Sequence, residues 1–165
     1  MKFFLTGRPG VGKTTLVNRL IERSGCKAVG FSTKKLNVCG EYKVYMFSFG
    51  EDIVPNDEKI VGICEGSFPK GFPEAFDRMG KELLSDIQDG DMVVFDELGI
   101  MENDALIFQK LVVDLLKRDV SVIGVIKPHS TPFLDSIRAL VWPHVYEVTA
   151  KNRDELFLKL VKEHF

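Results

Sequence analysis

Short apolar runs alternate along the chain with longer segments whose apolar residues recur at helical spacing. The runs have the length of buried strands and lie at 3–6, 28–31, 92–95, 120–126 and 145–148. The helical patterns lie near 14–23, 76–87, 105–117, 133–140 and beyond 153. Strands and helices that alternate in this way build βαβ units around a mostly parallel central sheet with helices on both faces. The pattern therefore predicts an α/β fold with five parallel strands.

Two segments depart from this alternation. Residues 42–49 follow a Cys39-Gly40 turn and alternate in polarity at their start, which favours an antiparallel strand. Residues 50–73 hold four of the chain's 14 glycines and three of its seven prolines, which predicts a variable loop or lid at about 50–75. No repeat or linker divides the chain, so we expect one domain over residues 1–165.

Composition narrows the class of protein. The 165 residues are 45% hydrophobic and carry a formal net charge of −2, so no overall basic field favours nucleic acid or an anionic membrane as a partner. The apolar runs fall far short of the roughly 18 residues needed to span a membrane. The three cysteines form no CxxC pair, which argues against a zinc site and fits a reducing compartment. We therefore expect a cytoplasmic globular protein.

The first candidate site is a glycine-rich segment between the first strand and the first helix. It matches the phosphate-loop motif G-x-x-x-x-G-K-[ST]. We expect nucleotide binding by Gly7, Arg8, Pro9, Gly10, Val11, Gly12, Lys13, Thr14 and Thr15. Glycines allow successive backbone N–H groups to point into one anion-binding nest at a helix N-terminus. Lys13 adds a charge for the β- and γ-phosphates, and Thr14 offers a hydroxyl ligand to Mg²⁺.

The second candidate site is a pair of carboxylates that follows the apolar run at 92–95. Parallel strands end at the edge of the sheet where open α/β folds bind their ligands. We expect Asp96 to hold Mg²⁺ or one of its water ligands. Glu97, just past the strand, is suited to orient or deprotonate an attacking water molecule. A general base beside a metal ligand favours hydrolysis as the reaction.

Several further polar residues follow the predicted strands. Lys127 either contacts the γ-phosphate as a catalytic residue or is a solvated loop lysine. Lys34 and Lys35 either reach the nucleotide or are solvated, and His129 is more typical of a loop residue than of a catalyst. Because these residues come after strands, any of them that has a role acts at the same edge of the sheet.

Recognition of the base has no clear signal in the sequence. There is no N-K-x-D segment of the kind that reads guanine. Trp142 and Tyr146 either stack on a base or belong to the core and its rim. We therefore expect nucleoside triphosphates with broad tolerance of the base as partners, whereas no feature identifies a protein partner.

Four blocks of sequence resemble the THEP-type nucleoside-triphosphatases, at 4–16, 30–33, 96–102 and 148–153. The segment D-E-L-G-I-M-E at 96–102 is the most discriminating of them. The resemblance implies a three-layer P-loop NTPase fold of the RecA-like kind. It also implies Mg²⁺-dependent hydrolysis of several nucleoside triphosphates, such as ATP and GTP, to diphosphate and phosphate.

The same resemblance implies roles for individual residues. Lys13, Thr14 and Asp96 take the binding and metal roles, and Glu97 activates water. Glu102 matches the family pattern, either as a substrate contact or as a cap of a helix at Asn103.

The chain departs from the family pattern after Thr33. Lys34-Lys35-Leu36 stands where members usually have an acidic residue followed by Val-Arg. Two other functions stay open: a nucleotide or small-molecule kinase that uses segment 50–75 as its acceptor site, and a nucleotide-gated GTP-binding adaptor. Residues 38–77 contain no arginine, which argues against the kinase, and the D-E-L-G-I-M-E block argues against the adaptor.

Overall fold

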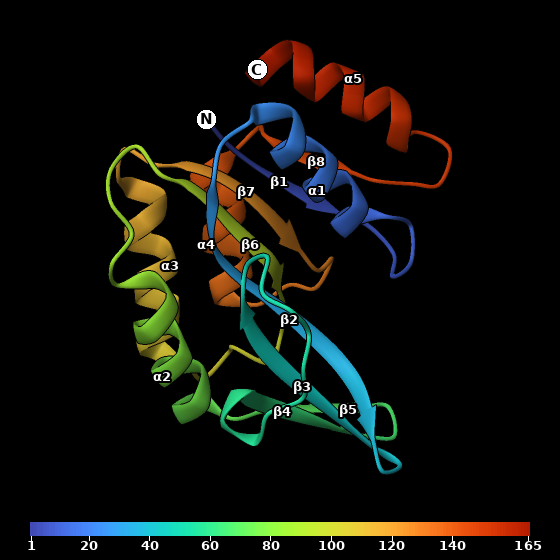
Figure 1. The fold of residues 1–165 in the computed structure, drawn as a ribbon, viewed down its shortest axis with the longest axis vertical. Helices are drawn as coiled ribbons and strands as arrows, with labels where there is room; N and C mark the ends of the chain where they lie inside the picture. Colours follow the sequence, from blue (N-terminus) through green and yellow to red (C-terminus); the bar gives the residue numbers. More distant parts are fainter.

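A single twisted sheet of eight strands forms the centre of the molecule (Figure 1). The computed structural model describes all 165 residues. In chain order the strands are β1 (Lys2–Thr6), β2 (Ala28–Val38), β3 (Glu41–Ser48), β4 (Ile60–Glu65), β5 (Phe68–Gly71), β6 (Met92–Leu98), β7 (Ser121–Ile126) and β8 (Val145–Glu147). Across the sheet their order is β5-β4-β3-β2-β6-β7-β1-β8.

Five of these strands run parallel, as the sequence predicts. β6 lies between β2 and β7, and β1 lies between β7 and β8. β7 therefore separates β1, which leads into the phosphate loop, from β6, which carries the two carboxylates. Because all five strands point the same way, their carboxyl ends meet at one edge of the sheet.

Five helices cover the two faces of the sheet. They are α1 (Lys13–Ser24), α2 (Pro73–Leu84), α3 (Leu106–Lys117), α4 (Pro132–Val141) and α5 (Arg153–His164), with one short 3-10 turn, η1 (Asp57–Lys59). α1 and α5 pack on one face through a cluster of 12 buried residues. α2, α3 and α4 pack on the other face through a cluster of 24. The three-layer α/β prediction is thus confirmed.

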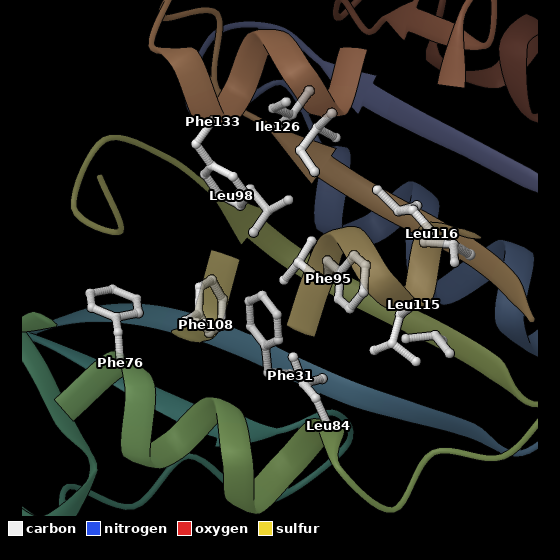
Figure 2. Close-up of a cluster of buried hydrophobic side chains, with 14 of the residues drawn as sticks. Phe31, Phe76, Leu84, Phe95, Leu98, Phe108, Leu115, Leu116, Ile126 and Phe133 are labelled. Atoms are coloured by element: carbon white, nitrogen blue, oxygen red, sulfur yellow. The ribbon is translucent and has the colours of Figure 1, made fainter. Parts of the chain in front are cut away.

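A cluster of phenylalanines links the larger helical layer to the sheet (Figure 2). The ring of Phe108 on α3 meets Phe31 on β2 and Phe76 on α2 edge-on, with centroids 5.4 and 5.5 Å apart. Phe31 in turn stacks on Phe95 of β6 at 5.5 Å. All four side chains are almost completely buried. This packing anchors β6, and with it the carboxylates, to a rigid layer.

The prediction of a long loop at 50–73 was wrong over residues 60–71. There β4 and β5 form an antiparallel hairpin that continues the β2–β3 hairpin and extends the sheet on one side (Figure 1). Cross-strand hydrogen bonds to neighbouring strands stabilise this segment despite its glycine and proline content. Pro69 is tolerated because β5 is the edge strand.

Two further boundaries differ from the prediction. The strand predicted at 28–31 continues to Val38, because residues beyond Ser32 pair with β3 after the pairing with β6 has ended. The helix predicted at 76–87 begins at Pro73 and ends at Leu84. It begins earlier because proline suits the first position of a helix. It ends earlier because Ile87, although buried, lies in the segment that follows the helix. None of the helices is both long and apolar enough to cross a membrane.

Candidate active site

A cleft of about 830 Å³ opens at the carboxyl edge of the parallel strands. Residues from four segments line it: the phosphate loop with the start of α1, the middle of β2, the end of β6, and the turn after β7. They are Gly7, Arg8, Pro9, Gly10, Gly12, Lys13, Thr14, Thr15, Thr33, Lys34, Lys35, Asp96, Glu97, Lys127, Pro128 and His129. The predicted phosphate-loop residues other than Val11, both carboxylates of β6 and Lys127 therefore lie in one cleft. Val11 packs against the core under α1 and α5.

The phosphate loop depends on glycine at two positions. Gly7 has a φ of 137°, and a Cβ atom there would lie 2.4 Å from the carbonyl oxygen of Val148. Gly12 has a φ of 95°, and a Cβ atom there would lie 2.9 Å from the Arg153 side chain. The backbone conformation disfavours a side chain at both positions, and at Gly7 the Val148 backbone also leaves no space for one. The loop thus turns tightly and delivers the chain to the N-terminus of α1 at Lys13.

Lys13 bridges the loop to the carboxylates. Its Nζ donates hydrogen bonds to the carbonyl oxygens of Gly7 and Arg8, each at 2.9 Å, and lies 3.9 Å from Glu97 Oε2. The side chain is only 8% exposed. Its ammonium group therefore stands between the loop that would hold phosphate and the carboxylate predicted to activate water.

Thr14 and Asp96 meet across the cleft although 82 positions separate them in the chain. The Thr14 hydroxyl donates to Asp96 Oδ2 at 3.0 Å. Both groups offer hard oxygen ligands, which Mg²⁺ prefers. Thr14 lies in the first turn of α1, directly after the phosphate loop, and Asp96 lies in β6. No group of three or more His, Cys, Asp or Glu side chains is arranged to hold a metal. This pair fits Mg²⁺, which completes its shell with water and phosphate oxygens.

A bulge brings both carboxylates of β6 to the cleft. Neighbouring residues of a regular strand point to opposite faces of the sheet, so only one of the two would face the nucleotide. The pairing of β6 with β7 shifts between Asp96 and Leu98, which makes Glu97 the extra residue. The structure thus corrects the expectation that Glu97 lies past the strand, because it lies within β6 at an irregularity.

Glu97 is held from two sides in the cleft. Lys127 Nζ lies 3.3 Å from Oε1, and the Thr33 hydroxyl lies 3.3 Å from the Glu97 backbone nitrogen, which donates to it. Lys127 follows β7 directly, and its side chain is 43% exposed. It is therefore a component of the cleft, and not a loop lysine without contacts.

Lys34 contacts the other carboxylate. Its Nζ lies 3.3 Å from Asp96 Oδ2, the same oxygen that receives the Thr14 hydroxyl. Lys35 lines the cleft next to it and lies over the ring of Tyr42, at 4.6 Å from the centroid. The sequence left both lysines open between nucleotide and solvent, because the length of β2 was not apparent.

The cleft is cationic although the chain as a whole has a net charge of −2. Five basic side chains face two carboxylates there: Arg8, Lys13, Lys34, Lys35 and Lys127. A positive pocket with low-dielectric walls concentrates anions such as nucleotide phosphates. The attraction for phosphate is therefore local.

Glu102 lies behind the cleft and is only 2% exposed. Both of its carboxylate oxygens accept a hydrogen bond from the backbone nitrogen of Gly99, at 3.0 and 3.2 Å. Burial raises the pKa of this carboxyl from 4.5 to about 7, and the Gly99 hydrogen bond opposes that rise only in part. Of the two expected roles, neither is observed: Glu102 does not line the cleft, and α3 begins only at Leu106.

The aromatic candidates for base stacking lie outside the cleft. Trp142 is 79% exposed at the end of α4, and Tyr146 packs against α5, where its hydroxyl lies 3.3 Å from Glu163 Oε2. Neither lines the cleft: Tyr146 packs at the margin of the core, and Trp142 is an exposed surface residue. His129 does line the cleft and is exposed there.

Comparisons with known proteins find relatives over nearly the whole length of the chain. The model of a family described as NTPase matches residues 2–161. The nucleoside-triphosphatase THEP1 of Methanocaldococcus jannaschii is 28% identical over 99% of this chain and 96% of its own. That of Aquifex aeolicus is 31% identical over 93% of each.

A solved structure extends the likeness to three dimensions. The crystal structure of THEP1 from Aquifex aeolicus superposes with a TM-score of 0.74 at 27% identity, covering 99% of this chain and 98% of that one. The family match spans nearly the whole chain, including the phosphate loop, the strand with the two carboxylates and the helix that begins at Arg153. The chain therefore belongs to the NTPase family, with the THEP1 nucleoside-triphosphatases as its relatives.

Proposed function

We propose that the chain hydrolyses nucleoside triphosphates to diphosphate and phosphate in this cleft, with Glu97 as the general base. The observation that carries the proposal is the position of Glu97, whose carboxylate lies 3.9 Å from the Lys13 ammonium and directly follows Asp96. Lys13 belongs to the loop that would hold the β- and γ-phosphates. A water molecule beside Glu97 would therefore face the terminal phosphorus.

The reaction is a displacement at the γ-phosphorus. Glu97 orients the water and accepts one of its protons while the water oxygen forms a bond to phosphorus. The bond between the γ-phosphorus and the β–γ bridging oxygen breaks, and its electron pair leaves with the diphosphate. Lys13 and the backbone N–H groups of the phosphate loop hold the charge that develops on the phosphate oxygens.

Thr14 and Asp96 would hold Mg²⁺. The chemistry that such an ion supplies when bound is neutralisation of charge on the β- and γ-phosphate oxygens. The two protein oxygens belong to segments 82 positions apart, and their hydrogen bond at 3.0 Å keeps them ready on one side of the phosphate loop. The ion is proposed from this pair of ligands and from the resemblance in sequence.

Broad tolerance of the base is part of the proposal. Apart from His129, no aromatic side chain lines the cleft, and Trp142 and Tyr146 lie elsewhere. The groups that converge in the cleft are cations, hydroxyls and carboxylates, which recognise phosphate and metal rather than a particular base. We therefore expect ATP, GTP, CTP and UTP to be hydrolysed at rates within about tenfold of one another, a difference of roughly 1.4 kcal/mol in transition-state binding.

Phosphate release by wild type and Glu97→Gln tests the proposal. It is measured with ATP, GTP, CTP and UTP, with Mg²⁺ or EDTA, and Glu82→Gln on the exposed side of α2 serves as the control. We expect Glu97→Gln to reduce turnover by roughly 10² or more, because glutamine cannot accept the proton. Nucleotide binding should be kept, because glutamine has the size of glutamate and the loss of its negative charge does not oppose phosphate binding. Unchanged turnover in this variant would show that Glu97 is not the base.

A further inference from the structure

The two carboxylates of β6 are each paired with a lysine from a different neighbouring strand. Lys127 follows β7 and reaches Glu97, whereas Lys34 belongs to β2 and reaches Asp96, each at 3.3 Å. β2 and β7 are the two strands that flank β6 in the sheet. The two carboxylates therefore have one lysine on each side, and of these two lysines only Lys127 contacts the predicted base.

The overhang of β2 places Lys34 at the cleft. β2 pairs with β6 only as far as Ser32, which lies opposite Asp96, and then continues for six residues beside β3 alone. Side chains two positions apart in a strand share a face, so Lys34 lies on the side of Ser32 and projects past the end of β6. The lysine thus comes from a strand that runs beyond the carboxyl edge and not from a flexible loop.

The contacts of Lys34 put its ammonium beside the metal and phosphate ligands. The Asp96 oxygen that it contacts is the one that accepts the Thr14 hydroxyl, so Lys34 Nζ and Thr14 Oγ1 stand within two hydrogen-bond lengths of each other. The Lys34 side chain is a quarter exposed, toward the cleft. When Asp96 ligates a metal ion, it no longer needs the lysine as its counter-charge.

We propose that Lys34 is a catalytic residue. When a nucleoside triphosphate binds, the Lys34 ammonium leaves Asp96, contacts the terminal phosphate and stabilises the charge of the transition state. The inference rests on the proposed function and adds to it a charge donor within the same chain. In the transition state of phosphoryl transfer, charge is spread over the oxygens of the transferred phosphoryl group, and a cation beside these oxygens accelerates the reaction strongly. Lys34, which lies beside the metal and phosphate ligands, supplies that cation here.

The affinity for triphosphate relative to diphosphate tests this proposal independently of turnover. Wild type, Lys34→Met and Lys34→Arg are titrated with a fluorescent diphosphate and with its non-hydrolysable triphosphate analogue, both with Mg²⁺. We expect Lys34→Met to weaken triphosphate binding about tenfold or more, the effect of one lost charge-assisted hydrogen bond, and to change diphosphate binding less than about threefold. We expect turnover to fall roughly 10²-fold, and Lys34→Arg to keep most of the triphosphate preference.

A matched control is Lys43→Met on β3. Lys43 has the same side-chain exposure as Lys34, 25%, and pairs with Glu41 at 3.8 Å, but it does not line the cleft. It should leave both affinities unchanged. If Lys34→Met lowered both affinities equally, Lys34 would only hold Asp96 in place, and if it lowered neither, Lys34 would be a surface residue; either result overturns the proposal.

Thermal unfolding shows whether Lys34→Met folds. If it does not fold, the shorter polar variant Lys34→Gln replaces it, with the same expected loss of triphosphate affinity and of turnover. The binding ratio also separates this proposal from that for Glu97. A normal rate in Glu97→Gln contradicts the general base, whereas the loss of triphosphate preference concerns Lys34 alone.

Discussion

The Lys127 ammonium lies 3.3 Å from Oε1 of Glu97, whereas Lys13 approaches the other oxygen at 3.9 Å. The carboxylate is thus oriented by cations on both sides. Because Lys127 is the closer and the more exposed of the two, removing it should misorient Glu97 without disturbing the fold. We expect Lys127→Met to lower turnover by about 10- to 100-fold, as measured by steady-state phosphate release.

The control for this prediction is Lys117→Met, which removes an exposed lysine at the end of α3. It should match wild type in turnover. In both variants the free energy of unfolding should stay within about 1 kcal/mol of wild type, since partly exposed ion pairs contribute little to stability. Full activity in Lys127→Met would show that Lys127 has no role in turnover.

The pairing of Thr14 with Asp96 predicts a specific change in metal dependence. Asp96→Asn keeps an oxygen that accepts the Thr14 hydroxyl but removes the negative charge that attracts Mg²⁺. We expect the Mg²⁺ concentration for half-maximal turnover to rise about tenfold or more. Binding of a fluorescent diphosphate in EDTA should stay equal or become tighter, because the cationic cleft has lost one carboxylate. Weaker binding in EDTA would contradict the assignment.

Burial of Glu102 predicts that stability depends on pH. Its pKa is about 7 in the folded protein, against an ordinary value of 4.5, so between these pH values the folded form holds a proton that the unfolded chain has released. The free energy of unfolding should therefore fall as pH rises from about 4.5 to 7 and stay lower above that range. The total loss is on the order of 3 kcal/mol, since each pKa unit corresponds to 1.36 kcal/mol.

Glu102→Gln tests this dependence because glutamine resembles the protonated acid and can still accept the hydrogen bond from Gly99. We expect thermal unfolding at pH 5, 6, 7 and 8 to show a flatter pH dependence than that of wild type, with a higher midpoint at pH 8. Glu82→Gln, at an exposed position, should retain the wild-type dependence. Parallel curves for Glu102→Gln and wild type would show that another group titrates.

The phenylalanine cluster predicts where the fold is most sensitive to mutation. Phe108 is fully buried and contacts two other phenylalanine rings, so Phe108→Ala would open a cavity between α2, α3 and the sheet. We expect a loss of about 3–5 kcal/mol in urea unfolding. Leu106→Ala, two residues away on the same helix at a side chain that is 70% exposed, should cost less than about 0.5 kcal/mol. Equal effects would contradict the packing described.

The parallel part of the fold follows from local pattern, because buried strands and amphipathic helices have distinct periodicities. The antiparallel extension does not. β4 and β5 contain glycine and proline and alternate poorly, and they are strands because β3 offers a hydrogen-bonding edge, which is a non-local condition. The same holds for the second half of β2, where Lys34 and Lys35 resemble loop residues until the pairing with β3 is known.

Most of the candidate site could be predicted because its residues belong to compact motifs. The phosphate loop and Asp96-Glu97 each occupy a few consecutive positions, and the rule that ligands bind at the carboxyl edge brings them together. The contact between Lys34 and Asp96 depends on how far β2 runs past β6, and the shared direction of the two carboxylates depends on a bulge. Neither the length of β2 beyond β6 nor the bulge can be read from the sequence pattern.

The long β2 strand also constrains how the chain can change in length. Residues of even number from Ser32 face the same way as Lys34, so inserting one residue between Ser32 and Lys34 would turn Lys34 to the opposite face of the strand. Lys35 would then share the face of Ser32, but two positions further from Asp96 than Lys34 is now. Insertions at the Cys39-Gly40 turn carry no such parity, because they lie beyond the last paired residues Val38 and Glu41. Related chains should therefore vary in length at the turn of the β2–β3 hairpin and have no insertions or deletions between Ser32 and Lys34.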